Sequence, residues 1–131
     1  MMYLQKQNKT IFIDRDNTII KDTGYTYKIK DLCFLPNSLN GLRNMRDLGY
    51  HLIIITNQSG VGRGLFSKDD YFIINNYLLE KLKDEGIKIN DVFQCFHCPE
   101  ENCQCRKPKT KFKDLARIMV EADFNKQKNR T

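Results

Sequence analysis

Residues 51–56, HLIIIT, form an almost unbroken apolar run with the length of one β-strand. A strand without alternating polar residues is typical of a parallel sheet that is buried on both faces. Shorter apolar runs predict two more strands, at residues 10–14 and at residues 91–96. Parallel strands require long crossover connections, so helices are expected between these three segments.

Helical signals lie in the expected places. Asn37 or Ser38 is a candidate N-cap and Gly49 a candidate stop for a first helix whose apolar positions are Leu39, Leu42, Met45 and Leu48. Ser67 and Asp70 resemble a capping box for a second helix, which ends near Gly86 and carries Tyr71, Ile74, Leu78 and Leu82 on one face. A last helix is predicted from Phe112, Leu115, Ala116, Met119 and Val120.

This alternation of strands and helices predicts an α/β fold with right-handed crossovers and a parallel sheet. The length of 131 residues fits a single domain. We expect a core at about 8–122, a cysteine-rich loop at 95–107 and a basic tail at 123–131. Ligands of such sheets bind at the carboxyl ends of the strands, where Asp14, Thr56 and the Cys95 region converge.

Charge and hydropathy restrict the functional classes. The formal net charge is +6, and residues 104–131 contain nine Lys or Arg against three Asp or Glu, so they hold the whole excess. Such an excess can attract phosphate groups, although a solvated tail explains it equally well. No apolar run reaches membrane length and no signal peptide is evident, which predicts a soluble cytoplasmic protein without a membrane partner.

Two aspartates follow the first predicted strand, and they define the candidate reaction centre. Asp14 and Asp16 are separated by one residue, so both carboxylates can reach one site. Neighbouring carboxylates repel unless a cation joins them, and Mg²⁺ suits a site completed by water and phosphate oxygens. One carboxylate can attack phosphorus while the other transfers protons. The alternative is that Asp14 caps a turn and Asp16 faces solvent.

Five potential soft metal ligands lie within the segment CFHCPEENCQCRKP: Cys95, His97, Cys98, Cys103 and Cys105. In a cytosolic chain such a cluster indicates metal binding before disulfides. Four of these ligands can close a tetrahedral zinc site with a structural role. Cys98 could replace His97 as a ligand, and disulfides or an iron–sulfur cluster remain as alternatives. Cys33, far upstream, is expected to be a small buried apolar residue.

Three separated motifs resemble those of the haloacid dehalogenase-like (HAD) phosphatases: FIDRDNTII, IIITNQSGVGRG and CRKPK. The forms TNQ and CRKP are similar to the family of D-glycero-D-manno-heptose-1,7-bisphosphate 7-phosphatases and histidinol-phosphate phosphatases. This resemblance implies a Rossmann-like three-layer HAD fold without a large cap domain. Asn17 replaces the glycine that is most common after the second aspartate, and asparagine tolerates the left-handed backbone well.

The resemblance also implies roles for individual residues. Asp14 would be the nucleophile and a Mg²⁺ ligand, and Asp16 the general acid and base that contributes to the same site through its main-chain carbonyl. Thr18 would support the nucleophile loop, and Thr56 and Lys107 would hold the transferred phosphoryl group. The implied structural Zn²⁺ ligands are Cys95, His97, Cys103 and Cys105. The loop that they close would carry Arg106 to the substrate and Lys107 to the phosphoryl group.

The short loops of this family select the phosphate ester. Two of them resemble the heptose type, through Asp22, Thr23, Gly24 and Tyr25 in one loop and Asn57, Gln58 and Ser59 in the other. The gap between His97 and Cys103 instead resembles histidinol-phosphate phosphatases. The expected reaction is Mg²⁺-dependent removal of the 7-phosphate of D-glycero-D-manno-heptose 1,7-bisphosphate, through an aspartyl-phosphate, with histidinol phosphate as the alternative substrate.

The family's fourth motif, an acidic strand end of the G-D-x-x-x-D kind, is absent from this sequence. Asp123 precedes the expected position and would lie at the wrong end of a strand. The C-terminal strands are therefore expected to be missing, which predicts a weaker Mg²⁺ site and an open edge on the strand at 10–14. A homodimer through that edge and a weak or inactive binding module are both consistent with this pattern. Nucleic acid is not an expected partner, because the cysteine loop lacks a finger helix and no aromatic residues interleave with the terminal lysines.

Overall fold

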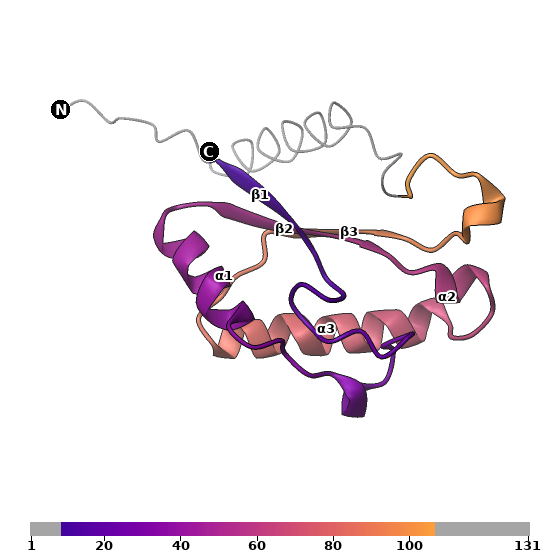
Figure 1. The fold of residues 1–131 in the computed structure, drawn as a ribbon, viewed down its shortest axis with the longest axis horizontal. Helices are drawn as coiled ribbons and strands as arrows, with labels where there is room; N and C mark the ends of the chain where they lie inside the picture. The colour runs from indigo at the N-terminus through magenta and orange to yellow at the C-terminus, as the bar shows by residue number, and fades with distance from the viewer. Residues whose placement is uncertain (1–8, 107–131) are drawn as a thin grey trace, which may run out of the picture.

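A three-stranded parallel sheet forms the centre of the protein, in a computed structural model that describes residues 9–106 (Figure 1). The strands are β1 (Thr10–Asp14), β2 (His51–Asn57) and β3 (Asp91–Cys95), and β2 lies in the middle. The predicted strands and their parallel pairing are confirmed. β3 ends at Cys95, one residue earlier than predicted, and β2 continues one residue further to Asn57.

Two long helices, α1 (Ser38–Asp47) and α3 (Lys68–Asp84), lie on the same side of the sheet (Figure 1). The capping box predicted for α3 is present: the Ser67 hydroxyl accepts from the Asp70 amide, and the Asp70 carboxylate accepts from the Ser67 amide. α1 begins differently from the prediction. Asn37 adopts a left-handed φ of 66°, and the side chain makes no capping hydrogen bond. Leu48 follows the helix and is 76% exposed, so it is not part of the buried face.

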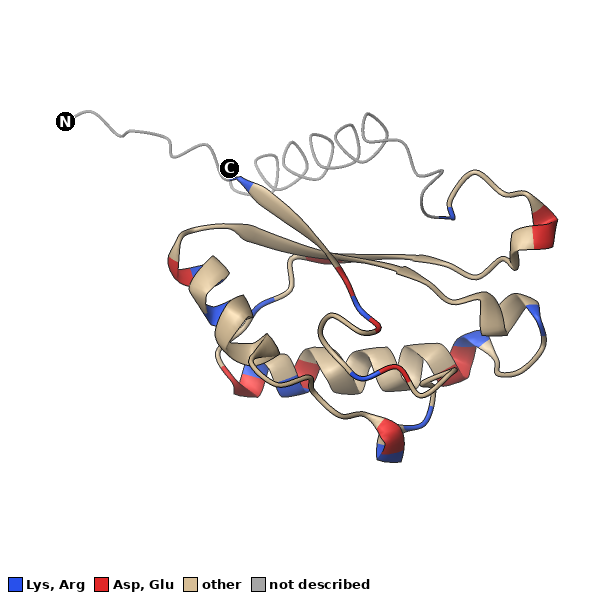
Figure 2. Ribbon diagram, in the orientation of Figure 1, with Lys and Arg blue, Asp and Glu red and all other residues tan. Residues whose placement is uncertain are grey.

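The core lies between this face of the sheet and the two helices. Its buried members are Ile13, Ile19, Ile20, Leu42, Leu52, Ile54, Leu78, Leu82 and Ile87. Along β2, Ile53 is also buried, although it points away from Leu52 and Ile54. The apolar run therefore predicted correctly that this strand is buried on both faces. Figure 2 shows the charged residues mainly on helices and loops, with much of the sheet uncharged.

The longest connection between these elements runs from residue 15 to residue 37, between β1 and α1. Residues 21–37 carry one 3₁₀ turn, Ile29–Asp31, and form no cap domain. Two predictions about loops are wrong. Cys33 is exposed rather than buried, since the segment around it lies at the surface. The segment NQSGVGRG contains a one-turn helix, α2 (Ser59–Gly62), because the Ser59 carbonyl accepts from the Arg63 amide at 2.9 Å.

Several predictions lie outside residues 9–106, namely the last helix, Lys107, Asp123 and the basic tail. The expected third layer is therefore not tested, and neither is the extent of the domain. In the described part of the chain, no helix combines the length and the apolar character needed to cross a membrane.

Candidate active site and metal centre

Strand register brings the predicted site residues to one edge of the sheet. Asp14 lies opposite Ile55, and Asn57 lies opposite Cys95, so the three strands end at nearly the same level. Beyond these ends is a cavity of about 360 Å³. Its lining residues are Asp14, Asp16, Asp22, Gly24, Tyr25, Thr26, Asn57, Gln58, Ser59 and Arg106. The structure thus brings together residues from both predicted substrate loops with the aspartate pair.

Two predicted site residues are placed differently, and a third lies outside the described residues. Thr56 and Thr23 are not among the residues that line this cavity. Thr56 is 1% exposed and lies behind Gln58, whereas Thr23 is exposed and bonds to its neighbour Thr26 instead. Lys107 lies outside the described residues, so its position relative to Asp14 is not tested.

A tight turn after β1 separates the two aspartates. The Asp14 carboxylate accepts from the Arg15 amide at 3.0 Å, and the strand ends there. The Arg15 carbonyl then accepts from the amides of Thr18, Ile19 and Ile20. Asn17 has φ of 62°, the left-handed conformation that the sequence predicted it would tolerate. Its side chain accepts from the Asp22 amide at 3.2 Å, which connects the turn to the next loop.

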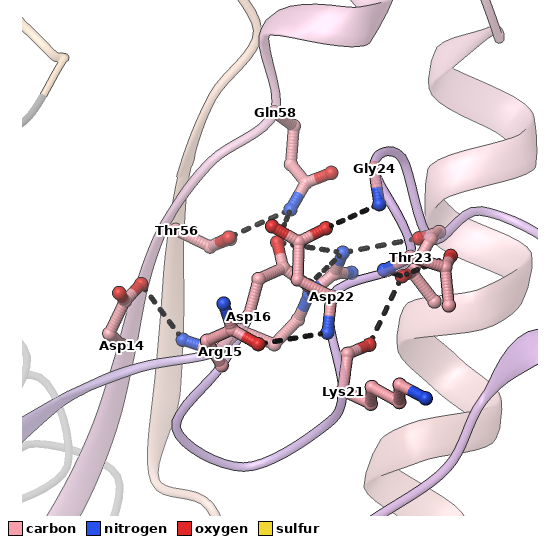
Figure 3. Close-up of polar contacts among 11 residues, drawn as sticks. Asp14, Arg15, Asp16, Lys21, Asp22, Thr23, Gly24, Thr56 and Gln58 are labelled. Carbon is pink, nitrogen blue, oxygen red and sulfur yellow. Dashed lines mark hydrogen bonds and ion pairs between the residues drawn. The ribbon is translucent and has the colours of Figure 1, made fainter.

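Asp16 is half-buried at the centre of a polar cluster (Figure 3). Its carboxylate accepts from Arg15 Nε at 3.1 Å and from Gln58 Nε2 at 3.2 Å. Burial raises the pKa of the Asp16 carboxyl above its ordinary value, and the charge of Arg15 opposes that rise without cancelling it. A carboxyl group with a raised pKa is suited to donating a proton near neutral pH.

The Gln58 amide joins the ends of β1 and β2. Its Nε2 donates to Thr56 Oγ1 at 2.7 Å as well as to Asp16 Oδ2 (Figure 3). The Gln58 backbone amide donates to the Cys95 carbonyl at 2.7 Å, so the same residue is also tied to β3. One residue thereby fixes the relative positions of three strand ends.

The loop at residues 22–26 closes another side of the cavity. Asp22 Oδ1 accepts from the Gly24 amide at 2.9 Å, and Gly24 has φ of 103°, a conformation that favours glycine. The buried Thr26 hydroxyl donates to the Lys21 carbonyl and accepts from the Thr23 amide. Tyr25 packs near Phe66, with ring centroids 6.3 Å apart, while 42% of it stays exposed.

Four soft ligands converge beside this cavity. The ligand atoms of Cys95, His97, Cys103 and Cys105 all lie within 4.8 Å of one another. Around a tetrahedral zinc with Zn–S bonds of about 2.3 Å, neighbouring sulfurs are about 3.8 Å apart, so this donor set fits the ion. Cys98 points elsewhere, with Sγ 3.4 Å from Glu101 Oε1. All five cysteines are free thiols in the structure.

The thiols of this cluster influence one another. Burial and a hydrogen bond with Cys105 raise the pKa of the Cys95 thiol to about 12. At Cys103, burial acts in the same direction, but hydrogen bonds from Cys95 and from the Arg106 backbone outweigh it and lower the pKa to about 7.

α2 packs directly on the start of the cysteine-rich loop. A Cβ added to Gly62 would lie 2.7 Å from the Cys98 nitrogen and from the Phe96 oxygen. An ion pair at 3.5 Å between Arg63 and Glu100 spans the same junction. The loop that holds the four ligands is therefore braced against the helix that begins with Ser59.

Two residues at this site were not predicted from the sequence. Thr26 lines the cavity, and the buried Arg15 side chain contacts Asp16 from behind. The threonine had no distinguishing signal within KDTGYTY. The arginine did have one, because a charged residue directly between two aspartates is placed to contact either of them.

The chain is similar to known phosphatases. The profile of the polynucleotide kinase 3 phosphatase family matches residues 9–130. A probable D-glycero-D-manno-heptose-1,7-bisphosphate 7-phosphatase of Thermoplasma volcanium is 44% identical over 102 residues, which cover 78% of this chain and 70% of that protein. The D-glycero-alpha-D-manno-heptose-1,7-bisphosphate 7-phosphatase of Photorhabdus laumondii is 39% identical, with 88% of this chain and 67% of that protein covered.

A solved structure shares the fold. The D,D-heptose 1,7-bisphosphate phosphatase from B. bronchiseptica, complexed with magnesium and phosphate, superposes with a TM-score of 0.79 at 30% identity. The match covers 86% of this chain and 64% of that one. The chain spans 60% to 70% of the length of the first four curated relatives that it matches.

The contact between α2 and the cysteine-rich loop leads to a prediction about stability. We expect Gly62→Ala to lower the free energy of unfolding by about 1–3 kcal/mol, because the new methyl group meets backbone atoms that cannot rotate away. Gly41→Ala is the matched control, since its Cβ would have nothing within 4 Å. That control should raise stability by about 0.5–1 kcal/mol through helix propensity. Urea denaturation measures both, and equal effects of the two variants would contradict the packing described.

Proposed function

The chain belongs to the HAD-like phosphatase family of the heptose-1,7-bisphosphate and histidinol-phosphate phosphatases, and we propose that it hydrolyses a sugar phosphomonoester. The substrate that we propose is D-glycero-D-manno-heptose 1,7-bisphosphate, with loss of the 7-phosphate. The observation that carries this proposal is the convergence of Asp14 and Asp16 on one polar cavity, together with both loops expected to contact substrate.

The geometry supports a two-step displacement. An Asp14 carboxylate oxygen attacks phosphorus, and the bond from phosphorus to the sugar oxygen breaks. Asp16 gives its proton to that oxygen, so the sugar leaves as an alcohol and an acyl phosphate remains on Asp14. Water then attacks the phosphorus and loses a proton to Asp16, which releases phosphate and restores both carboxyl groups.

Magnesium fits the donor set of the cavity. Three carboxylates line it, from Asp14, Asp16 and Asp22, and hard oxygen ligands of this kind suit Mg²⁺. We propose that the Asp14 carboxylate and the Asp16 main-chain carbonyl hold the ion. When bound, Mg²⁺ offsets the negative charge of the phosphoryl oxygens that would otherwise repel the attacking carboxylate.

The remaining polar groups are proposed to position the ester. Arg106 lines the cavity, and its Nη1 is buried without a hydrogen-bond partner among the described residues, so it can donate to a substrate oxygen. Asn57, Ser59 and Tyr25 line the same cavity. Thr56 lies behind Gln58 and accepts from its side-chain amide, so we propose that it supports the phosphoryl site through Gln58. We propose that Lys107 contacts the phosphoryl group.

We also propose that Cys95, His97, Cys103 and Cys105 bind a structural Zn²⁺. The fit of their ligand atoms supports this set over one that includes Cys98, whose thiol lies against Glu101. Bound zinc would hold the loop that carries Arg106, which lines the cavity. Zinc would therefore affect the reaction only by positioning Arg106.

The activity proposal predicts selective phosphate release. In the presence of Mg²⁺, the chain should release phosphate faster from heptose 1,7-bisphosphate than from histidinol phosphate or a 3′-phosphorylated oligonucleotide. Asp14→Asn should lower the rate at least about 1,000-fold, because it removes the nucleophile. A chelator of Mg²⁺ should abolish release. A colorimetric phosphate assay measures each rate.

Asp47→Asn is the matched control, because Asp47 is an exposed carboxylate that pairs with Arg46 on α1. Its rate should equal that of the unaltered chain. Faster release from histidinol phosphate would favour the alternative substrate. No release from any ester would favour the alternative of a binding module without activity.

The zinc proposal predicts unequal effects of two cysteine substitutions. Cys103→Ser should lower zinc affinity at least about 10-fold, because it removes one of the four ligands of the cluster. Cys98→Ser should leave affinity unchanged, because its thiol lies outside that cluster. Competition with a chromogenic chelator measures both. Loss of zinc from the Cys98 variant alone would contradict the ligand set.

We further propose a cytoplasmic protein that self-associates through β1. Within residues 9–106, β1 pairs with β2, and we propose that a strand of a second copy associates with β1 as well. Sedimentation velocity should then show a dimer at micromolar concentration, and a monomer at every concentration would contradict this proposal.

A further inference from the structure

Arg15 is the most deeply buried charged side chain in the described part of the molecule, with 1% of it exposed. It lies between the two aspartates, yet the reaction described above gives it no role. Burial of a guanidinium group is unfavourable unless its donors and its charge are satisfied. Its Nε and Nη2 find acceptors, whereas Nη1 is buried without a hydrogen-bond partner among the described residues. The contacts that Nε and Nη2 make therefore indicate what the residue does.

The first contact is with the Asp16 carboxylate. Arg15 Nε donates to Oδ1 at 3.1 Å and Nη2 donates to Oδ2 at 3.2 Å, a forked arrangement that fixes both the position and the rotation of the carboxylate. Gln58 binds Oδ2 from the β2 side. The proposed proton donor is thus held by Arg15 on one side and by Gln58 on the other.

The second contact is with the loop at residues 22–26. Arg15 Nη2 also donates to the Thr26 carbonyl at 3.2 Å. Because Asp22, Gly24, Tyr25 and Thr26 all line the cavity, this bond ties the wall of the cavity to the group that orients Asp16. A Lys side chain has a single nitrogen and lacks the fork needed to make all three bonds.

The third contact fixes the guanidinium itself. Its central carbon lies 5.8 Å from the centre of the Tyr71 ring on α3, within cation–π range. The Tyr71 hydroxyl donates to Gln94 Oε1 on β3 at 3.2 Å, so the ring that supports Arg15 is itself anchored to the sheet. Arg15 therefore contacts α3 on one side and binds the Asp16 carboxylate on the other.

We propose that Arg15 is a positioning residue that aims the Asp16 carboxyl at the leaving oxygen and holds the 22–26 loop against it. The inference rests on the proposed phosphatase function. Protonation of the leaving group and the position of the 22–26 loop would then both depend on the Arg15 side chain.

The test compares two esters with different leaving groups. A sugar alkoxide needs a proton to leave, whereas p-nitrophenolate leaves without one. We expect Arg15→Met to lower kcat for heptose 1,7-bisphosphate about 100-fold and kcat for p-nitrophenyl phosphate less than about threefold. Arg15→Lys should give an intermediate loss on the sugar ester only. Arg46→Met, a matched change at an exposed arginine on α1, should alter neither rate.

A second readout does not depend on activity. Hydrogen exchange of the backbone amides in residues 22–26 should be at least about 10-fold faster in Arg15→Met, because the bond to Thr26 is lost, while exchange in β2 stays the same. Arg15→Lys serves as the milder variant if the Met variant unfolds, and a rise in exchange throughout β2 would identify that case.

The outcomes separate the two proposals. If the unaltered chain is inactive on both esters, the phosphatase proposal is wrong. Hydrogen exchange at residues 22–26 then still tests whether Arg15 holds the loop. An equal loss of kcat on the two esters would show that Arg15 does not orient the Asp16 carboxyl toward the leaving oxygen. Unchanged hydrogen exchange at residues 22–26 in both Arg15 variants would show that Arg15 does not hold the loop.

Discussion

Parallel pairing of three strands in one register is the constraint on which the site depends. Asp14, Asn57 and Cys95 each end a strand, and the pairing of Asp14 with Ile55 and of Asn57 with Cys95 places these ends side by side. Asp14 and Asn57, which are more than 40 positions apart in the chain, thereby line one cavity. A shift of one residue in either pair would turn the site residues of that strand to the other face of the sheet.

Around these strand ends, a few residues fix the relative positions of the site side chains. Gln58 donates to both Thr56 and Asp16, and its backbone amide bonds to Cys95, so its hydrogen bonds cross the whole edge. Gly62 allows α2 to approach the cysteine-rich loop more closely than any other residue could. The cluster of Cys95, His97, Cys103 and Cys105 is therefore connected to the aspartate pair through packed elements, although only the aspartates are proposed to take part in the chemistry.

The sequence predicted the features that local pattern controls. Apolar runs predicted all three strands within one residue, and Ser67 with Asp70 predicted the start of α3. The sequence could not show whether His97 or Cys98 joins the other three ligands, because the two residues are adjacent. In the structure the Cys98 thiol contacts Glu101, which lies in the 3₁₀ turn Pro99–Glu101. The sequence-based prediction also missed the burial of Arg15, since that depends on Tyr71 and Thr26, which are distant in sequence. Thr56 was predicted beside the phosphoryl group, yet the cavity as described is lined by Gln58 in front of it.

We propose that Asp14 accepts the phosphoryl group in a cavity closed by both loops. Crystals grown with Mg²⁺ and beryllium fluoride, which mimics a phosphoryl group attached to a carboxylate, would test this proposal. We expect the beryllium fluoride on an Asp14 carboxylate oxygen, with the Asp16 carboxyl facing it and still held by Arg15. Beryllium fluoride bound away from Asp14, or Asp16 turned away from it, would rule out this mechanism.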